Sequence, residues 1–216
     1  SVVNSSATVN VAGTSVLSST GNATLSAEST VKSTVKPTGL GLSETADAAV
    51  AISTISSTAT VVVGGSSAIT SGGALELSAK NDVQAETVAD ISARPTAVGG
   101  TVAVTELTTV TQASIEDAAQ TSSASLTVKA ESKNTVLNTA KAAAKGAQKQ
   151  PEAGKTPANA SQTEKSLEKY KDEGSTSEGS VDVAAAVAIV SLNSQTQASI
   201  GSSALQNTTG LATVSS

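Results

Sequence analysis

An internal repeat of about 52 residues is the feature that most limits how this 216-residue chain can fold. A block of alternating polar and large apolar residues recurs four times, and we mark it by Leu25, Leu77, Val128 and Val214. Successive markers are separated by 52, 51 and 86 residues. A fixed period of this size predicts a stack of similar units, each in contact with its neighbours, in place of one irregular core.

A second recurring block supports the same period. It occupies residues 6–9, 58–61, 112–115 and 197–200, which are separated by 52, 54 and 85 residues. Short Val/Ala/Ile alternations precede three of these copies, at 50–52, 102–104 and 187–189. Two independent blocks with nearly the same spacing indicate four copies of one unit.

Alternation within the blocks predicts β-strands. In the second copy Leu75, Leu77 and Ala79 fall on one side of an extended chain, and Glu76 and Lys80 fall on the other. Glycines between the blocks supply turns. We therefore predict an all-β fold, a parallel β-solenoid of about four repeats, in which the four markers are buried at equivalent positions. Two unlike coils per period are favoured, since solenoid coils commonly take roughly 20 to 25 residues, and one coil with a long arm remains the alternative.

The third unit is about 34 residues too long, and one segment accounts for the surplus. Residues 145–178 contain two prolines, six lysines and six acidic residues, unlike the Val/Ala/Thr/Ser background. We predict solenoid over 1–144, a charged looped insertion over 145–178, and solenoid again over 179–216. A capping box beginning at Ser161 predicts a short helix at about 162–173. Residues 134–148 include a run of helix formers at 140–145, but repeat context predicts strand there up to about Ala140.

Composition removes most catalytic chemistry. The chain has no Phe, Trp, Met, Cys or His, and Tyr170 is its single aromatic residue. Histidine bases, thiol nucleophiles and zinc sites with these ligands are therefore excluded. The net charge is −5 and Arg94 is the single arginine, which argues against nucleic acid as a partner. The longest apolar run, 181–192, is interrupted by Asp182 and is too short for a membrane span of about 20 residues.

Carboxylates are the remaining candidates for catalysis or metal binding. They form the series Asp82, Glu86 and Asp90, the adjacent pair Glu116 and Asp117, and the neighbours Glu44 and Asp47. Even spacings place the first series on one exposed strand face, where we interpret it as solubilising charge. The aligned residues Glu28, Lys80 and Glu131 alternate in sign, which avoids like-charge ladders between copies. We predict no catalytic residue, no metal site and no cofactor.

Two further motifs suggest surface chemistry. Asparagines that begin an N-glycosylation triplet are Asn4, Asn22, Asn159 and Asn207. Threonine pairs that could order water on ice are Thr58 with Thr60 and Thr109 with Thr111. A chain so rich in Ser and Thr produces such triplets by composition, and the β-propensity of threonine explains the pairs.

The repeat units resemble those of very large bacterial surface proteins. Residues 187–201 and 71–79 are similar to repeats of filamentous-haemagglutinin-like and autotransporter-like adhesins, and the resemblance covers nearly all of the chain except 145–178. It implies a right-handed parallel β-helix in a secreted stalk, and it gives no role to the insertion.

We therefore expect a non-enzymatic structural segment of an exported bacterial surface adhesin or extracellular filament. A glycan- or ice-binding module is the alternative, and a carboxylate-dependent glycan-cleaving β-helix is third. The expected location is extracellular or at the cell surface. Expected partners are further repeats stacked head to tail, from the same or a neighbouring chain, with host or matrix glycans or proteins as a second class of partner.

Overall fold

The computed structural model describes residues 1–37, 46–91, 98–142 and 183–216. Their regular structure is all β, and no helix occurs among them. The strands form three parallel sheets of four strands each. Every repeat gives one strand to each sheet, so the predicted all-β parallel β-solenoid is confirmed. The right hand of the coil stays a prediction.

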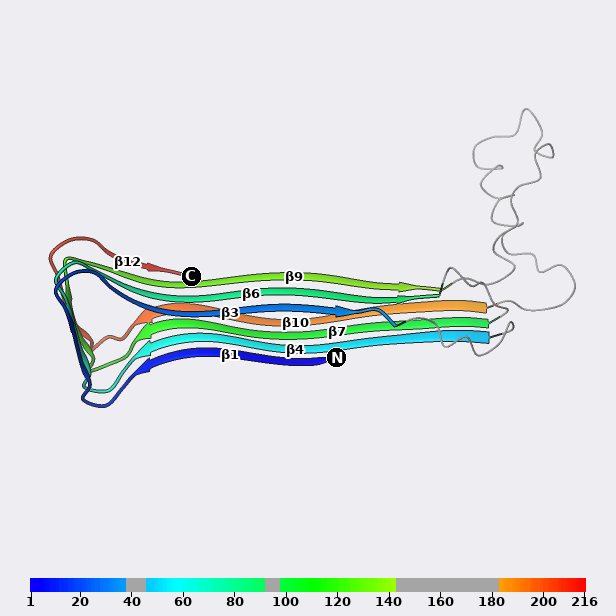
Figure 1. Ribbon diagram of the computed structural model, residues 1–216, viewed down its shortest axis with the longest axis horizontal. Helices are drawn as coiled ribbons and strands as arrows, with labels where there is room; N and C mark the ends of the chain where they lie inside the picture. Colours follow the sequence, from blue (N-terminus) through cyan, green and yellow to red (C-terminus); the bar gives the residue numbers. More distant parts are fainter. Residues whose placement is uncertain (38–45, 92–97, 143–182) are drawn as a thin grey trace, which may run out of the picture.

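Each coil has two long sides and one short side (Figure 1). Sheet A contains β1 (Val2–Val11), β4 (Ala46–Val63), β7 (Val98–Ile115) and β10 (Val183–Ile200). Sheet B contains β2 (Val16–Ser19), β5 (Ala68–Ser71), β8 (Gln120–Ser123) and β11 (Leu205–Thr208). Sheet C contains β3 (Ala23–Val35), β6 (Ala74–Asp90), β9 (Ser125–Lys141) and β12 (Ala212–Ser215). Sheets A and C pack face to face, and sheet B closes one end.

One coil uses one whole period, so the prediction of two unlike coils per period is wrong. The strands of sheets A and C reach 18 and 17 residues, much longer than those of a compact coil. Two such strands and a four-residue strand account for most of the 52 residues. The alternative of one coil with a long arm describes the structure.

Strand pairing tests the predicted alignment residue by residue. In sheet C, Leu25 pairs with Leu77, Leu77 with Val128, and Val128 with Val214, as the first block predicted. In sheet A, however, Ala59 pairs with Thr111, so the spacing of 54 in the second block is wrong by two residues. A shift of two keeps every side chain on its own face, so alternation alone does not reveal it.

The surplus residues of the third unit leave the pairing intact on both sides. β9 pairs with β6 at an offset of 51 residues, for example Ala140 with Ala89, whereas β10 pairs with β7 at an offset of 85, for example Val183 with Val98. The difference equals the 34 predicted extra residues. The strand predicted over 134–140 is confirmed, because β9 extends to Lys141. The boundaries 145–178 and the helix at 162–173 lie outside the described residues.

The interior between sheets A and C is divided into apolar clusters and polar bands. One cluster lies beside sheet B around Leu77, a second around Ile55, and a third around Ala51. In the band between the first two, a bond of 2.8 Å joins Ser29 of the first coil to Ser57 of the second, and another of 2.8 Å joins Ser57 on sheet A to Asn81 on sheet C of the same coil. The second band contains Ser33, Ser53, Thr87 and Thr105. These side chains satisfy one another in the buried interior.

The corners between sheets A and B contain a left-handed backbone residue in the first three coils. Gly13 and Gly65 have φ of 70° and 64°, and a Cβ on Gly65 would lie 2.8 Å from the carbonyl oxygen of Gly13. Glycine is therefore required at Gly65 by both conformation and space. In the third coil the positive φ, 66°, falls instead on Ala118, where a side chain is strained.

Candidate functional site

The series Asp82, Glu86 and Asp90 lies on the outer face of sheet C, on β6, as the sequence predicted. Neighbours in this series are four strand residues apart, about 13 Å, which is longer than the separation of roughly 5 to 9.5 Å in paired catalytic carboxylates. Glu86 forms an ion pair with Lys36 at 2.6 Å, and Asp90 lies 3.8 Å from Lys141. The series therefore places separate carboxylates beside lysines and forms no acid pair of its own.

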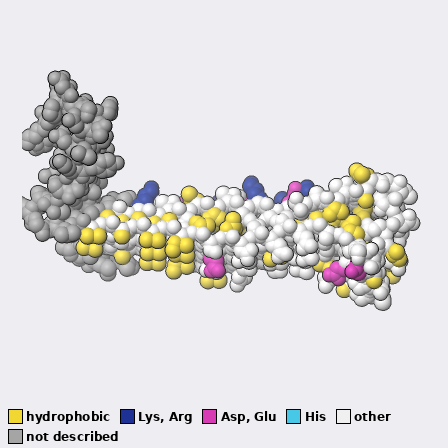
Figure 2. All heavy atoms as spheres, turned by 180° about the vertical axis from the view of Figure 1, so that it is seen from behind, with side chains coloured by type: hydrophobic (Ala, Val, Ile, Leu, Met, Phe, Trp, Pro, Cys, Tyr) yellow, Lys and Arg dark blue, Asp and Glu magenta, His cyan; other side chains and the backbone are white. Residues whose placement is uncertain are grey.

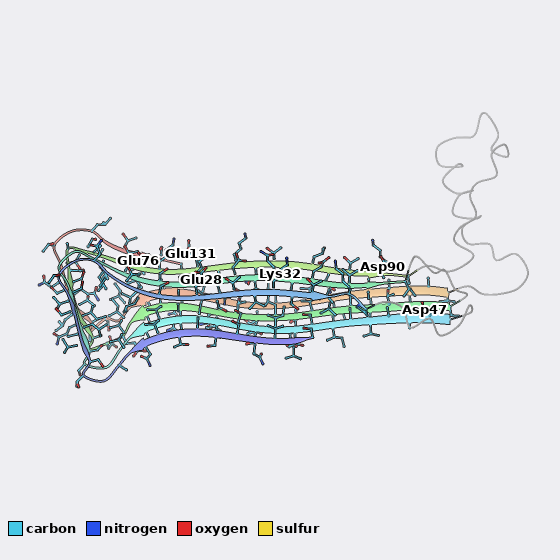
Figure 3. The ribbon with its side chains drawn as sticks, viewed as in Figure 1. Glu28, Lys32, Asp47, Glu76, Asp90 and Glu131 are labelled. Atoms are coloured by element: carbon cyan, nitrogen blue, oxygen red, sulfur yellow. The ribbon has the colours of Figure 1, made fainter. Side chains whose placement is uncertain are left out.

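The aligned charges Glu28, Lys80 and Glu131 are neighbours across sheet C, also as predicted. Glu28 and Lys80 form an ion pair at 2.8 Å, whereas Glu131 turns to Lys129 at 2.7 Å. The hydrogen bond to Glu28, and then its negative charge, raise the pKa of Lys80 above its ordinary value. Figure 3 shows Glu28 and Glu131 among the side chains along the outside of this sheet. Exposed pairs of this kind contribute little to stability.

One residue from each of the other two carboxylate pairs, Asp117 and Asp47, accepts a hydrogen bond from a backbone N–H group. Asp117 accepts a hydrogen bond from the backbone N–H of Ser203 at 2.8 Å, so it holds the corner of the next coil. Asp47 is buried at 4% exposure and accepts the N–H of Ala48 at 2.8 Å. Glu44, its predicted neighbour, lies outside the described residues.

The threonine pairs do not form one surface. Thr58 and Thr60 point outward from β4, whereas Thr109 and Thr111 are buried on β7 at 1% and 0% exposure. The side chain of Thr109 donates a hydrogen bond to Ser194 inside the stack. These four residues therefore do not form a shared ice-binding ladder. Of the glycosylation triplets, Asn4, Asn22 and Asn207 are exposed and Asn159 lies outside the described residues.

The two outer faces of the solenoid differ in charge. The outer face of sheet C carries the described lysines, which are Lys32, Lys36, Lys80, Lys129, Lys133 and Lys141. On the outer face of sheet A, Glu106 is the one ionisable side chain within the described strands. At the end away from sheet B this second face is mostly aliphatic, an arrangement that the sequence analysis missed.

The missed signal lies in the short alternations such as 50–52. Ala51 is buried at 1% exposure, whereas Val50 and Ile52 are 57% and 51% exposed. The larger side chains therefore face outward, contrary to what their size suggests. Counting alternate residues back from the buried Ile55 gives the correct face, because β4 continues without a bulge between them.

The comparisons with known proteins add no relative. No family model, curated protein or solved structure matches the chain. Within the described residues, no three of the His, Cys, Asp or Glu side chains are grouped as a metal site would require. No helix in that part of the chain is long and apolar enough to cross a membrane.

Proposed function

We propose that this chain is a structural repeat segment that acts as a stalk or scaffold in an exported bacterial surface adhesin or extracellular filament. The observation that carries the proposal is the unbroken parallel pairing of each coil with the next in three separate sheets. Even the corners continue this pairing, since the N–H groups of Gly64, Glu116 and Gly201 bond the preceding coil at 2.7 to 2.8 Å. Such pairing suits a part whose role is to transmit load and keep a fixed shape.

The distribution of charge supports a scaffold more than an enzyme. Glu86 and Asp90 lie beside lysines, Asp117 holds a backbone N–H group, and the carboxylates along β6 are too far apart to act on one bond. We propose that the segment lies outside the cell or at its surface. Its proposed partners are further coils, from the same or a neighbouring chain, stacked head to tail.

Mechanical unfolding of single molecules tests the scaffold role. The chain would be pulled between two handle domains, and we expect high-force events that release one unit each. A unit is about 52 residues, roughly 180 Å of extended chain, and the unit with the surplus residues releases about 34 residues more. The variant Leu77→Ala should lower the unfolding force, because it opens a cavity in the buried stack. Unfolding at forces no higher than those of an ordinary globular handle would contradict the scaffold role.

Glycan-array binding and glycan-hydrolysis assays test the alternatives. A scaffold should give neither specific binding nor turnover. Specific glycan binding that Thr58→Ala abolishes would support the alternative of a binding module, with Thr30→Ala on the opposite face as the control. Turnover that Asp82→Asn abolishes would support the carboxylate-dependent enzyme.

A further inference from the structure

The outer face of sheet A carries an aliphatic patch at the end away from sheet B. Its side chains form cross-strand rows from β4, β7 and β10, in which Val50 pairs with Val102 and Val102 with Val187. The next row consists of Ile52, Val104 and Ile189, and in a third Val98 pairs with Val183. We call these eight residues the aliphatic patch. In Figure 2 blocks of hydrophobic side chains are visible near the end where the grey residues begin.

The side chains of the patch are exposed to solvent, although the strands that carry them are hydrogen-bonded to one another. Val187 and Ile189 are 46% and 49% exposed, and Val98 is 52% exposed. Three strands about 4.8 Å apart and seven residues of about 3.3 Å each cover roughly 300 Å² of sheet. Exposed apolar patches of a few hundred Å² commonly mark an interaction surface.

The charge distribution limits what can cover this patch. The described lysines lie on the opposite outer face, so this one offers no basic residues to an anionic lipid or nucleic acid surface. Its single described ionisable side chain, Glu106, lies beyond the last row of the patch. A partner therefore has to be flat, uncharged and aliphatic, which describes this same face on another molecule.

We propose that two copies of this chain associate laterally by packing the outer faces of sheet A against each other. A twofold axis in the interface places the aliphatic patch of one copy on that of the other, as a closed isologous dimer requires. The branched side chains of Val and Ile then interdigitate as in a β-sandwich, where sheets lie about 10 Å apart. This contact is distinct from head-to-tail stacking, and it does not depend on the proposed function.

The area of the face is sufficient for a stable dimer. Each of β4, β7 and β10 has 18 residues. Strands of that length cover about 60 Å by 14 Å, roughly 850 Å² per copy. A standard interface buries about 800 Å² per partner. Beyond the patch the face carries Glu106 and neutral residues such as Ser56, Thr108 and Asn193, which form a polar border of the kind found around interface cores.

Sedimentation equilibrium and light scattering of the full chain test the dimer. We expect a concentration-dependent mass in which lateral association accounts for a doubling, whereas head-to-tail contact gives larger species that substitutions in the aliphatic patch leave in place. Val104→Lys, in the middle strand of the patch, should weaken dimerisation at least tenfold, and Val102→Lys provides a second test if that variant misfolds. Thr30→Lys, on the outer face of sheet C, should leave the dimer unchanged. Circular dichroism checks that each variant keeps its β-structure.

Site-directed cross-linking identifies the face in contact. The chain has no cysteine, so Val104→Cys introduces a single thiol, and a short bis-maleimide should join two copies through it. Thr30→Cys should not cross-link. A wild-type chain that stays monomeric at several hundred micromolar overturns the proposal. A dimer that is unaffected by Val104→Lys, or a monomer that binds neutral phosphatidylcholine vesicles through this face, overturns it as well.

Discussion

The second and fourth coils place equivalent side chains in very different surroundings. Leu77 and Val214 occupy one position of the repeat, and both pair with Val128. Leu77 is fully buried, whereas Val214 is 46% exposed, so the prediction that all four markers are buried is wrong at the last of them. Leu25, in the first coil, is only partly buried. Burial at a given repeat position is therefore set by the coils on either side.

Sheet A shows the same contrast. Leu107 is fully buried on β7, and Leu192, its partner on β10, is 54% exposed. β10 pairs with β7 over its whole length, and the four residues of β12 are the part of sheet C described for the same coil. Pairing gives the fourth coil its register, and stacking gives the inner coils their stability.

Charged substitutions at Leu77 and Val214 should give the largest difference in stability between the second and fourth coils. Leu77→Asp places an unpaired carboxylate in the buried cluster and should destabilise the fold by more than about 4 kcal/mol. Val214→Asp should change stability by less than about 0.5 kcal/mol, because the side chain already reaches water. Urea denaturation curves of both variants measure the difference. Equal losses would show that Val214 contributes to stability as much as the buried Leu77 does.

Removal of a buried amide tests the polar band. The Asn81 side chain accepts a bond from Ser57 and donates one to the backbone of Ser57, at 2.8 and 3.0 Å. Asn81→Ala leaves buried groups without partners and should cost about 1 to 3 kcal/mol. Asn134→Ala, in the third coil, should cost less, because its contacts of 3.1 to 3.3 Å lie in a partly exposed place. Thermal denaturation ranks the two, and the reverse order would refute the role assigned to this band.

A glycine at the corner of the third coil should stabilise the fold. Ala118→Gly relieves a left-handed alanine that costs about 1 to 2 kcal/mol, and part of this gain is lost to the greater freedom of glycine in the unfolded chain. We expect stabilisation of up to about 1 kcal/mol. Ala124→Gly, at an exposed corner without positive φ, is the control and should destabilise. A loss of stability in both would argue that the strain at Ala118 is absent.

The smallest effect is expected at the exposed ion pair of sheet C. Because the pKa of Lys80 is raised in the folded state, its contribution is complete below the ordinary lysine pKa and is lost as the pH rises through the folded value. Glu28→Gln should return the pKa of Lys80 toward its ordinary value, which NMR titration measures. Glu76→Gln is the control, and an unchanged pKa of Lys80 in the Glu28 variant would show that Glu28 is not the cause.

The sequence supported most of the fold because the repeat carries long-range information. The period, the parallel pairing of Leu25 with Leu77 and the extent of β9 followed from it. The number of coils per period did not, because strand length depends on how far sheets A and C stay packed together. The two-residue error at Ala59 has another cause: alternation repeats every two residues, so only side-chain identity separates neighbouring registers.

The surface was less predictable than the pairing. The charges of sheet C were placed correctly, since alternating Glu and Lys residues mark a solvated face. The aliphatic patch was missed because Val50 and Ile52 flank a small Ala51, and burial depends on the phase of the whole strand and not on residue size. The burial of Thr109 was missed for the same reason, as it faces the polar band.

The polar bands have a mechanical consequence for the stack. Coils held by backbone pairing alone could slide along the strand direction in steps of two residues, about 6.8 Å, and keep every face unchanged. Such a step between the first two coils would move Ser57 on β4 away from Ser29 on β3, to which it is hydrogen-bonded at 2.8 Å. Buried hydroxyl groups that lose their partners in this way are costly. The bands therefore add to the resistance of the backbone ladders against shear between coils, and they fix which of the registers two residues apart is adopted.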